Sequence, residues 1–510
     1  MIPWRSLIES CFFYTHIDGM FVMNTSQENK NIAKRYYPDL KLIIDGEYIS
    51  RDGNPVINPS TGEAIAEVPF ATIADLEKSV DAASKGFLEW SEMSPAKREG
   101  LMRDAASILR DRSDEIAQSI TLEQGKPVAQ SKVEIQRACE IIEWDASEGR
   151  RTYGRVIPSQ MPLTHTVLRK PIGPVAALSP WNFPINSPGR KVAGALAAGC
   201  SIILKASEET PAGAFELVRA YHDAGVPPGV VNLIFGVPAE ISEFLINSDI
   251  TRLITFTGSI PVGKHLAALA AGQMKPTIME LGGHAPVLVD EAVDPVEVAK
   301  TCAIGKSRNA GQVCVSPTRF LVHNRIYDRF LDSFVEQANS LKVGDGFGDG
   351  IEMGPVANER RLNAMQEFIN DATDKGATLS AGGHQIGNQG YFHEMTVLAD
   401  VPDNARVANE EPFGPLAIVN KVASMDDAIN VANKLPYGLA AYAFTNSAYV
   451  AEQLAHRVES GNLSINHLVA SVAETPFGGI KESGYGREGG TEGLDCYTIV
   501  KNISHLTSTV

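Results

Sequence analysis

The sequence contains little cysteine and little positive charge, and it has no long hydrophobic run. The six cysteines among 510 residues show neither metal-ligand spacing nor a disulfide-rich pattern, so we expect no metal site and a reducing, cytoplasmic setting. Lys and Arg number 45 against 61 Asp and Glu, and the net charge of -16 argues against nucleic acid or anionic membrane as the main partner. The most apolar stretches, such as Val192–Ala198, are too short to cross a bilayer. A small molecule is therefore the expected partner.

Between Val175 and Glu280, short apolar runs alternate with amphipathic stretches of helical period. The runs are Val175–Leu178, Ser201–Leu204, Val230–Ile234 and Leu253–Phe256, and the predicted helices are Pro188–Ala198, Ala212–Ala224, Ala239–Asn247 and Pro261–Ala271. Runs without polar alternation are typical of strands buried on both faces, and the strand–helix order indicates a parallel sheet covered by helices. We therefore expect an α/β fold of the nucleotide-binding type, which alone does not decide function.

Two further regions extend this pattern. After Asp290, Asp294 and Pro295 have the composition of a helix start, and the helix–strand alternation continues as far as Leu341. The segment Arg151–Lys170 is rich in Thr, Val and Pro and interrupts the alternation. Because 510 residues exceed what one hydrophobic core usually organises, the sequence predicts two or three domains and an extended arm.

The strongest chemical signal is a thiol in the segment Asn309–Ser316 (NAGQVCVS). Small and polar residues surround Cys314, so a substrate carbonyl could approach its sulfur closely, as a nucleophilic cysteine requires. A lone cysteine is otherwise most often a small buried residue. We assign that structural role to Cys302, which lies within an apolar predicted helix.

A carboxylate in Met279–Pro286 (MELGGHAP) is the second signal. Glu280 ends an apolar predicted strand and is followed by two glycines, which allow backbone or cofactor to come close. A partly desolvated carboxylate there would have a raised pKa suited to a general base, although a capping or salt-bridged glutamate fits the pattern as well. We expect His284 to be a structural hydrogen-bonding residue.

The third signal is Phe256–Gly263 (FTGSIPVG), a strand that runs through a glycine turn into a helix. Free N–H groups and the dipole of a helix N-terminus favour a pyrophosphate. The segment is not a GxGxxG motif, and an ordinary strand–helix connection is about twice as common an explanation for such a glycine turn.

Taken together, seven motifs in order resemble the aldehyde dehydrogenase superfamily over nearly the whole chain from about Lys41. They are PWNFP at Pro180–Pro184, LKASEETP at Leu204–Pro211, FTGSIPVG, MELGGHAP, NAGQVC, EEPFGP at Glu410–Pro415 and PFGGIKESGYGRE at Pro476–Glu488. The resemblance implies an α/β fold with a Rossmann-like parallel-sheet cofactor domain, a second α/β catalytic domain and a small β oligomerisation arm.

The resemblance also implies a mechanism. Cys314 would attack an aldehyde to give a thiohemiacetal, while the Asn182 side chain and the Cys314 backbone N–H hold the oxyanion. Hydride transfer to a nicotinamide would leave a thioester, which water activated by Glu280 hydrolyses. Lys191 and Glu488 match supporting polar or proton-relay positions, and a purely structural role suits these two equally well.

NAD is the cofactor that the resemblance implies. The matching positions are Lys205 and Glu208 at the adenosine ribose, Gly258, Ser259 and Gly263 near the phosphates, Glu411 at the nicotinamide ribose, and Trp181 and Phe413 nearby. A carboxylate at position 208 accepts ribose hydroxyls but repels a 2′-phosphate, so we predict NAD over NADP.

Arginines near the nucleophile indicate the substrate. Arg190, Arg308 and Ser471 match the residues with which succinate-semialdehyde dehydrogenases hold the distant carboxylate, and Arg binds carboxylate as a rigid two-pronged donor. Ordinary ion pairs on the protein are the alternative for both arginines. We expect oxidation of succinate semialdehyde to succinate, ahead of glutarate or 2-oxoglutarate semialdehyde. A CoA-acylating enzyme is a weaker alternative, since such enzymes generally lack the glutamate base.

The resemblance further implies domain boundaries and a homodimer or homotetramer. Residues 1–36 are expected to be a disordered extension, 37–150 and 171–282 the NAD-binding domain, and 283–478 the catalytic domain. Residues 151–170 and 489–510 are expected to pair between subunits, because edge strands expose backbone groups that can bind another chain.

Overall fold

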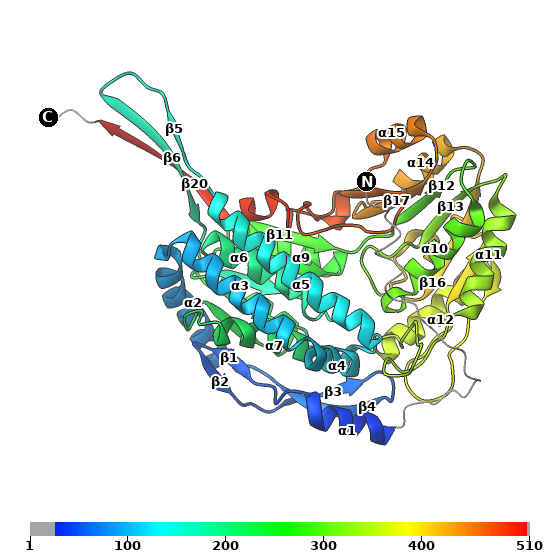
Figure 1. Ribbon diagram of the computed structural model, residues 1–510, viewed down its shortest axis with the longest axis horizontal. Helices are drawn as coiled ribbons and strands as arrows, with labels where there is room; N and C mark the ends of the chain where they lie inside the picture. Colours follow the sequence, from blue (N-terminus) through cyan, green and yellow to red (C-terminus); the bar gives the residue numbers. More distant parts are fainter. Residues whose placement is uncertain (1–25, 507–510) are drawn as a thin grey trace.

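The computed structural model describes residues 26–506, which form two α/β lobes and a projecting β arm (Figure 1). Each lobe is built around its own sheet, with one buried hydrophobic cluster in the first lobe and three in the second. The predicted α/β class with a parallel-sheet domain, a second α/β domain and an arm is confirmed. Among the described residues, no helix is both long enough and apolar enough to cross a membrane.

The first lobe contains an eight-stranded sheet whose central five strands are parallel. In spatial order the strands are β19 (Gly484–Tyr485), β11 (Thr277–Leu281), β10 (Leu253–Gly258), β7 (Val175–Leu178), β8 (Ile202–Lys205), β9 (Val231–Ile234), β1 (Leu42–Ile44) and β2 (Glu47–Ile49). β7, β8 and β9 are buried along their whole length, which explains their unbroken apolar composition. The four strands predicted between Val175 and Glu280 are confirmed to within two residues.

Helices cover this sheet in two layers. Those that pack directly on its strands are α2 (Ile73–Glu92), α6 (Asn186–Ala198), α7 (Pro211–Asp223), α8 (Pro238–Asn247) and α9 (Ile260–Gly272). Those that pack outside α6 and α7 are α3 (Pro95–Asp111), α4 (Ser113–Gln124) and α5 (Val128–Glu148). In Figure 1, α3 and α5 cross the front of this lobe side by side.

The second lobe has a seven-stranded sheet that is parallel except at one edge. Its strands are β14 (Thr378–Ala381), β15 (Thr396–Ala399), β16 (Leu416–Val422), β13 (Arg319–His323), β12 (Pro286–Val289), β17 (Ala440–Phe444) and β18 (Asn462–Ile465). Its helices are α10 (Pro295–Ser307), α11 (Tyr327–Ser340), α12 (Glu359–Asp374), α13 (Arg406–Asn409), α14 (Met425–Asn433) and α15 (Ala448–Arg457). The predicted start of α10 is confirmed: Pro295 is its first residue, and the Asp294 side chain accepts a hydrogen bond from the Val296 N–H.

The chain passes between the lobes at two neighbouring places. β11 of the first sheet leads into β12 of the second through the short connection Gly282–Ala285. The return is made by β19, which pairs antiparallel with β11 and sets Glu280 opposite Gly484. Gly484 has φ +114°, and a Cβ there would lie 1.8 Å from the Met279 carbonyl oxygen, so only glycine fits this approach.

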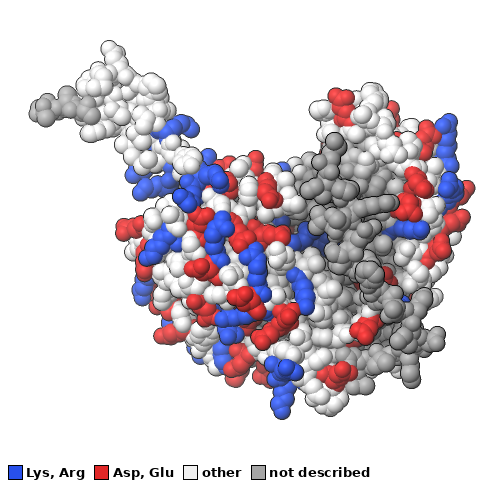
Figure 2. Space-filling model, viewed as in Figure 1, with Lys and Arg blue, Asp and Glu red and all other residues white. Residues whose placement is uncertain are grey.

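The arm is a three-stranded antiparallel sheet of β5 (Arg155–Ile157), β6 (Leu163–Pro171) and β20 (Thr498–Leu506). β20 pairs with β6 along its full length, so residues Thr498–Leu506 belong to the arm. Figure 2 shows that the outer part of the arm carries neither acidic nor basic side chains, whereas both signs mingle over the first lobe. The exposed large apolar side chains of the arm are Val156, Ile157, Met161, Leu163, Ile499, Val500, Ile503 and Leu506.

A helix and a strand pair lie near the start of the described chain. Of the expected extension, residues 26–36 form helix α1 (Ser26–Tyr36), whose Ala33 is buried and whose Asn29 side chain donates to Asp345; residues 1–25 lie outside the described part. A turn at Asn58–Gly62 joins β3 (Gly53–Asn58) and β4 (Glu63–Pro69), which pair with each other.

Candidate active site

The predicted residues of the first lobe gather at one edge of its sheet. The parallel strands run β9-β8-β7-β10-β11, so the strand order reverses between β7 and β10. Ligands of open α/β sheets bind at such a switch point, outside the carboxyl ends of the strands. Asn182 follows β7, Lys205 ends β8, Ser259 follows β10, and Glu280 lies near the end of β11. The topology therefore brings these four residues to the edge where a ligand is expected.

Cys314 lies in a tight loop after α10, as the sequence predicts. Three successive residues before it, Asn309, Ala310 and Gly311, have φ angles of +50°, +52° and +70°. The left-handed region costs a residue with a side chain on the order of 1–2 kcal/mol, so this loop holds backbone strain. Its shape is stabilised by the Gln312 side chain, which donates to the Asn309 carbonyl oxygen and accepts from the Ala357 N–H.

The Cys314 side chain is half-buried, whereas Cys139, Cys200 and Cys302 are fully buried. Burial, followed by the charges of Glu411 and Glu280, raises the pKa of the Cys314 thiol to about 12. The protein alone therefore holds this sulfur as a thiol, and attack on a carbonyl requires that its proton be removed.

Asn182 links the two lobes beside this thiol. The Asn182 side-chain amide donates a hydrogen bond of 3.0 Å to the Gln312 backbone carbonyl oxygen. The Asn182 backbone carbonyl oxygen accepts one of 3.1 Å from the Asn309 side chain. A carboxamide carries two N–H donors, so one donor of Asn182 is left beyond its bond to Gln312. The arrangement suits a donor for an oxyanion that forms near Cys314.

Glu280 is 3% exposed, and neither of its carboxylate oxygens has a hydrogen-bond partner in the described part of the chain. Burial, followed by the negative charge of Glu488, raises its pKa well above the usual range. A Cβ at Gly478 would lie 2.8 Å from a Glu280 oxygen, so the backbone passes directly against this carboxyl group. A buried carboxyl group without partners is typical of a functional acid or base.

Lys191 and Glu488 form an ion pair next to Glu280. Their charged atoms are 2.7 Å apart, and the Lys191 ammonium also donates to the Thr255 hydroxyl at 3.2 Å. Both side chains are buried. The pair joins α6 to the segment after β19, and Glu488 acts on Glu280 through its charge.

On the cofactor side, the structure brings Lys205 and Glu208 together. The Lys205 ammonium donates to the Glu208 carboxylate at 2.5 Å, with the lysine buried and the glutamate partly exposed. Nearby, Ser259 is the N-cap residue of α9 but makes no capping hydrogen bond with its side chain. The N-terminus of α9 therefore keeps free N–H groups, which suit a phosphate.

Two predicted glycines of this turn are required by close packing. A Cβ at Gly258 would lie 2.3 Å from the Phe256 ring, and one at Gly263 would lie 2.3 Å from the Leu281 side chain. Gly263 thus allows α9 to pack tightly on β11, which is the purpose of a glycine at such a helix–strand contact.

Three further predicted cofactor residues are Glu411, Phe413 and Trp181. The rings of Trp181 and Phe413 meet edge to face with centroids 5.6 Å apart. The Glu411 carboxyl group accepts a hydrogen bond from the Gly283 N–H, and burial raises its pKa to about 8.

Arg190 contacts the predicted third member of its set. Its guanidinium donates to the Ser471 hydroxyl at 3.3 Å and lies 5.0 Å from the centre of the Phe477 ring. The other terminal nitrogen, Nη1, is buried and has no hydrogen-bond partner in the described chain. Arg190 therefore has a donor available for a ligand.

The Arg308 guanidinium lies 5.7 Å from the centre of the Phe183 ring. The residue is exposed, and within residues 26–506 its side chain makes neither a hydrogen bond nor an ion pair. Its charge and that of Arg190 both interact with Cys314. The positive charge of Arg137 on α5 also acts on Arg308. The alternative of ordinary ion pairs on the protein does not hold for Arg190 or Arg308 in the described chain.

Sequence reasoning missed Arg137, and it also missed the buried ion pair of Lys126 and Glu134 that contacts the Asn182 segment. A charged residue on a helix is usually solvated, and these three lie on or next to α5, which carries no motif. The structural assignments made for two other residues are confirmed: His284 bonds to the Val407 carbonyl oxygen at 2.9 Å, and Cys302 is fully buried in α10.

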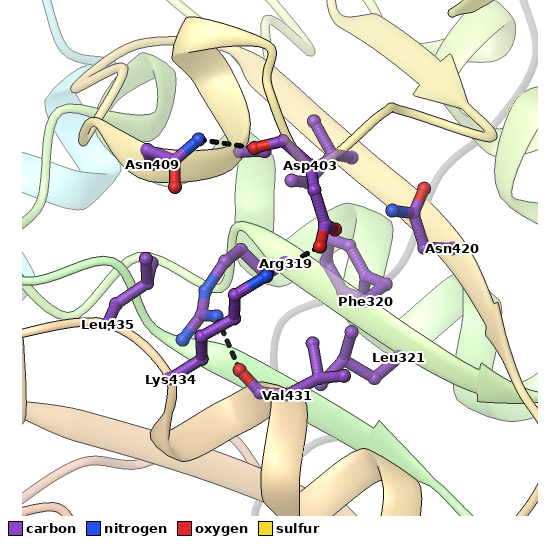
Figure 3. Close-up of a pocket in the computed structure, with 11 residues that line it drawn as sticks. Arg319, Phe320, Leu321, Asp403, Asn409, Asn420, Val431, Lys434 and Leu435 are labelled. Carbon is purple, nitrogen blue, oxygen red and sulfur yellow. Dashed lines mark hydrogen bonds and ion pairs between the residues drawn. The ribbon is translucent and has the colours of Figure 1, made fainter.

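A small cavity of about 40 Å³ lies elsewhere, between β13 and α14 (Figure 3). Arg319 reaches across it and donates to the Val431 and Ala432 carbonyl oxygens at the end of α14. Lys434 and Asp403 pair at its rim. The arginine satisfies carbonyl groups that a helix end leaves free, so its role is structural.

Comparison with known proteins agrees with this geometry. The model of the aldehyde dehydrogenase family matches residues 48–503. A putative 4-(hydroxymethyl)benzenesulfonate dehydrogenase of Comamonas testosteroni is 45% identical, over 91% of this chain and 98% of its own. The NADP(+) succinate-semialdehyde dehydrogenase of Escherichia coli is 36% identical, over 90% and 96%. The crystal structure of succinate-semialdehyde dehydrogenase from Burkholderia pseudomallei superimposes with a TM-score of 0.90 at 37% identity, over 92% and 98%. The chain therefore belongs to the aldehyde dehydrogenase family.

Proposed function

We propose that this protein oxidises an aldehyde with a distant anionic group to the carboxylic acid, with NAD as cofactor and succinate semialdehyde as the first candidate substrate. The observation that carries the proposal is the pair Arg190 and Arg308, whose charges interact with Cys314 and which have no ion-pair partner in the described chain. A guanidinium without a protein partner is suited to bind a carboxylate of the substrate.

In the proposed reaction, the Cys314 sulfur attacks the aldehyde carbon after loss of its proton and forms a thiohemiacetal. The free N–H of the Asn182 amide and the Cys314 backbone N–H stabilise the oxyanion, and such a donor contributes about 3–4 kcal/mol. NAD supplies the hydride acceptor when it is bound. The product on the enzyme is a thioester of Cys314.

Glu280 is proposed to remove a proton from the water that hydrolyses this thioester. Its unpartnered oxygens and buried position leave it able to accept that proton. The Lys191–Glu488 pair, which acts on Glu280 through charge, is proposed to pass the proton onward. The presence of Glu280 favours hydrolysis over transfer of the acyl group to CoA.

Members of the family use NAD or NADP, and the choice here depends on Glu208. Lys205, Glu208 and the uncapped N-terminus of α9 fit a dinucleotide in kind: a cation and a carboxylate for the ribose, and free N–H groups for the phosphates. Because a carboxylate repels a 2′-phosphate, we propose NAD. Glu411, together with the contacting rings of Phe413 and Trp181, would hold the nicotinamide end.

A second candidate substrate is an aromatic aldehyde with a sulfonate group. The 45%-identical relatives are named for 4-(hydroxymethyl)benzenesulfonate, and Arg137 adds a third positive charge close enough to act on Arg308. Glutarate and 2-oxoglutarate semialdehyde remain candidates of the carboxylate class, and one relative is named as a glutarate-semialdehyde dehydrogenase.

We further propose that residues 37–150 and 171–282 form the NAD-binding domain, that 283–478 form the catalytic domain, and that 151–170 and 489–510 join subunits into a homodimer or homotetramer. The uncharged outer part of the arm and its exposed apolar side chains support this role (Figure 2).

The test is the rate of NADH formation with succinate semialdehyde, uncharged butanal and 4-formylbenzenesulfonate, each with and without CoA. We expect kcat/KM for an anionic aldehyde to exceed that for butanal by about 100-fold, the equivalent of one charge-assisted contact of ~3 kcal/mol, with no need for CoA. A higher kcat/KM for butanal would contradict the anionic substrate class. A requirement for CoA would contradict the hydrolytic reaction.

A further inference from the structure

A buried ion pair lies under the turn that carries Asn182. The Lys126 ammonium and the Glu134 carboxylate are 2.5 Å apart, and both side chains are 1% exposed. Lys126 follows the end of α4, and Glu134 lies in the second turn of α5. Taking two charges out of water is costly, so such a pair adds little to stability over apolar residues of the same volume. The other hydrogen bonds of Lys126 and Glu134 therefore indicate the role of the pair.

Those hydrogen bonds all go to one short segment. Lys126 donates to the Asn182 carbonyl oxygen at 2.9 Å. The Glu134 carboxylate accepts from the backbone N–H groups of Ile185 at 3.0 Å and Asn186 at 3.2 Å. The ion pair thus holds the turn between β7 and α6 at Asn182 and at the start of α6. The Glu134 carboxylate lies at the positively polarised N-terminus of α6.

The Asn182 side chain is held from the opposite side by the loop of the nucleophile. Its amide donates to the Gln312 carbonyl oxygen, two residues before Cys314. The Asn182 carbonyl oxygen accepts from both Lys126 and Asn309. With the backbone fixed by the ion pair and one amide hydrogen fixed by Gln312, the remaining N–H has a single direction.

We propose that Lys126 and Glu134 are positioning residues for the oxyanion donor, which hold the Asn182 amide at the distance and angle that the reaction at Cys314 requires. The proposal rests on the role of Asn182 in the proposed function. A displacement of about 1 Å at a reacting group can lower a rate by about 100-fold. Residues that hold the Asn182 backbone should therefore act on kcat rather than on KM.

The test is a double-mutant cycle of Lys126→Met and Asn182→Ala, measured as kcat and KM with an anionic aldehyde and as NAD affinity by fluorescence titration. We expect Lys126→Met to lower kcat by about 10–100-fold with KM and NAD affinity nearly unchanged. Since Lys126 acts through Asn182, the double variant should be no slower than Asn182→Ala alone. Lys126→Arg, which keeps the cation, should recover part of kcat.

Two further variants keep the test decisive if Lys126→Met folds poorly. Lys126→Met combined with Glu134→Leu removes both charges, so no unpaired carboxylate stays buried and the thermal unfolding midpoint should return toward that of the native protein. Its kcat should nevertheless remain low. Lys132→Met is the matched control, because Lys132 lies on α5 with Glu134 and pairs with Asp114 at the surface; it should leave kcat unchanged.

The outcomes separate this inference from the proposed function. If Asn182→Ala is slow and the double variant is slower still by the product of both single losses, the positioning role is overturned while the oxyanion role stands. Native kcat in the folded Lys126→Met/Glu134→Leu protein overturns it too. If Asn182→Ala alone keeps native kcat, the oxyanion assignment fails and the positioning role fails with it.

Discussion

The polar groups of the candidate active site fall into two sets, one paired within the protein and one unpaired. Asn182, Lys191 and Glu488 each make hydrogen bonds to protein groups. In the described chain, the oxygens of Glu280 and the Nη1 atom of Arg190 have none, although they are buried. Buried polar atoms are nearly always satisfied, so those that are not mark places for water or substrate. We expect the paired groups to fix the geometry of the site and the unpaired groups to bind water or substrate.

The largest expected effect comes from the proposed nucleophile of this site. Cys314→Ala removes the covalent step, so we expect NADH formation with any aldehyde to fall by at least about 10⁴-fold, as for other covalent nucleophiles. Steady-state absorbance of NADH measures this. Cys496→Ala is the control, because Cys496 is also a partly exposed thiol but carries no proposed role. Native activity in Cys314→Ala would end the covalent mechanism.

The next effect concerns the unpaired carboxyl group. Glu280→Gln should lower kcat by about 10²–10⁴-fold, since the amide cannot accept a proton from water. Because the pKa of Glu280 is raised, the carboxylate fraction grows as pH increases. The kcat of the native protein should therefore rise with pH and fall as pH drops through that pKa, while the slow Glu280→Gln protein loses this limb. A pH–rate profile from mildly acidic to alkaline pH checks both, and an identical limb in the variant would assign the titration to another group.

The unpaired arginines should act on KM rather than kcat. Arg308→Ala removes a guanidinium that is proposed to bind the far end of the substrate, so KM for succinate semialdehyde should rise by about 10–100-fold. KM for butanal should change little, because butanal has no anionic group. Arg325→Ala, which alters an exposed arginine paired with Glu291, is the control. Equal effects on both aldehydes would show that Arg308 has a structural role.

The smallest effect is expected at the cofactor. Glu208→Gln keeps a hydrogen-bonding side chain but removes the charge that repels a 2′-phosphate, so the ratio of kcat/KM for NADP to that for NAD should rise by about 10-fold. Initial rates with each cofactor at fixed aldehyde measure it. A native enzyme that already prefers NADP would contradict the assignment of Glu208.

The sequence predicts the unpaired residues better than it predicts Lys126 and Glu134, the ion pair that holds the Asn182 backbone. Glu280, Arg190 and Arg308 stand in motifs or next to the nucleophile, and their chemical types indicate their use. Lys126 and Glu134 were not predicted, because their roles depend on contact with Asn182, which lies 56 residues beyond Lys126. A charge pair near helix ends is usually solvated, and only tertiary packing shows that this one is buried.

The fold shows the same division. The run Val175–Leu178 predicts a buried strand because its composition has no polar residue, and β7 has those bounds. In the segment Ala96–Ile120, α3 ends at Asp111 and α4 begins at Ser113, within the polar run Arg110–Glu115, which has no glycine or proline to mark the break. Composition and periodicity report burial, whereas the direction in which a helix leaves its neighbour is decided by packing.

The pairing of β11 with β19 makes the second lobe an insertion whose two ends meet in one sheet. Glu280 lies on one of these strands and Gly484 on the other, so the wall behind this carboxyl group is completed by chain made about two hundred residues later. When Cys314 and Glu280 have both been synthesised, β19, the strand that pairs with Glu280, has not yet been synthesised. The wall behind Glu280 is thus completed only after the whole second lobe has been synthesised.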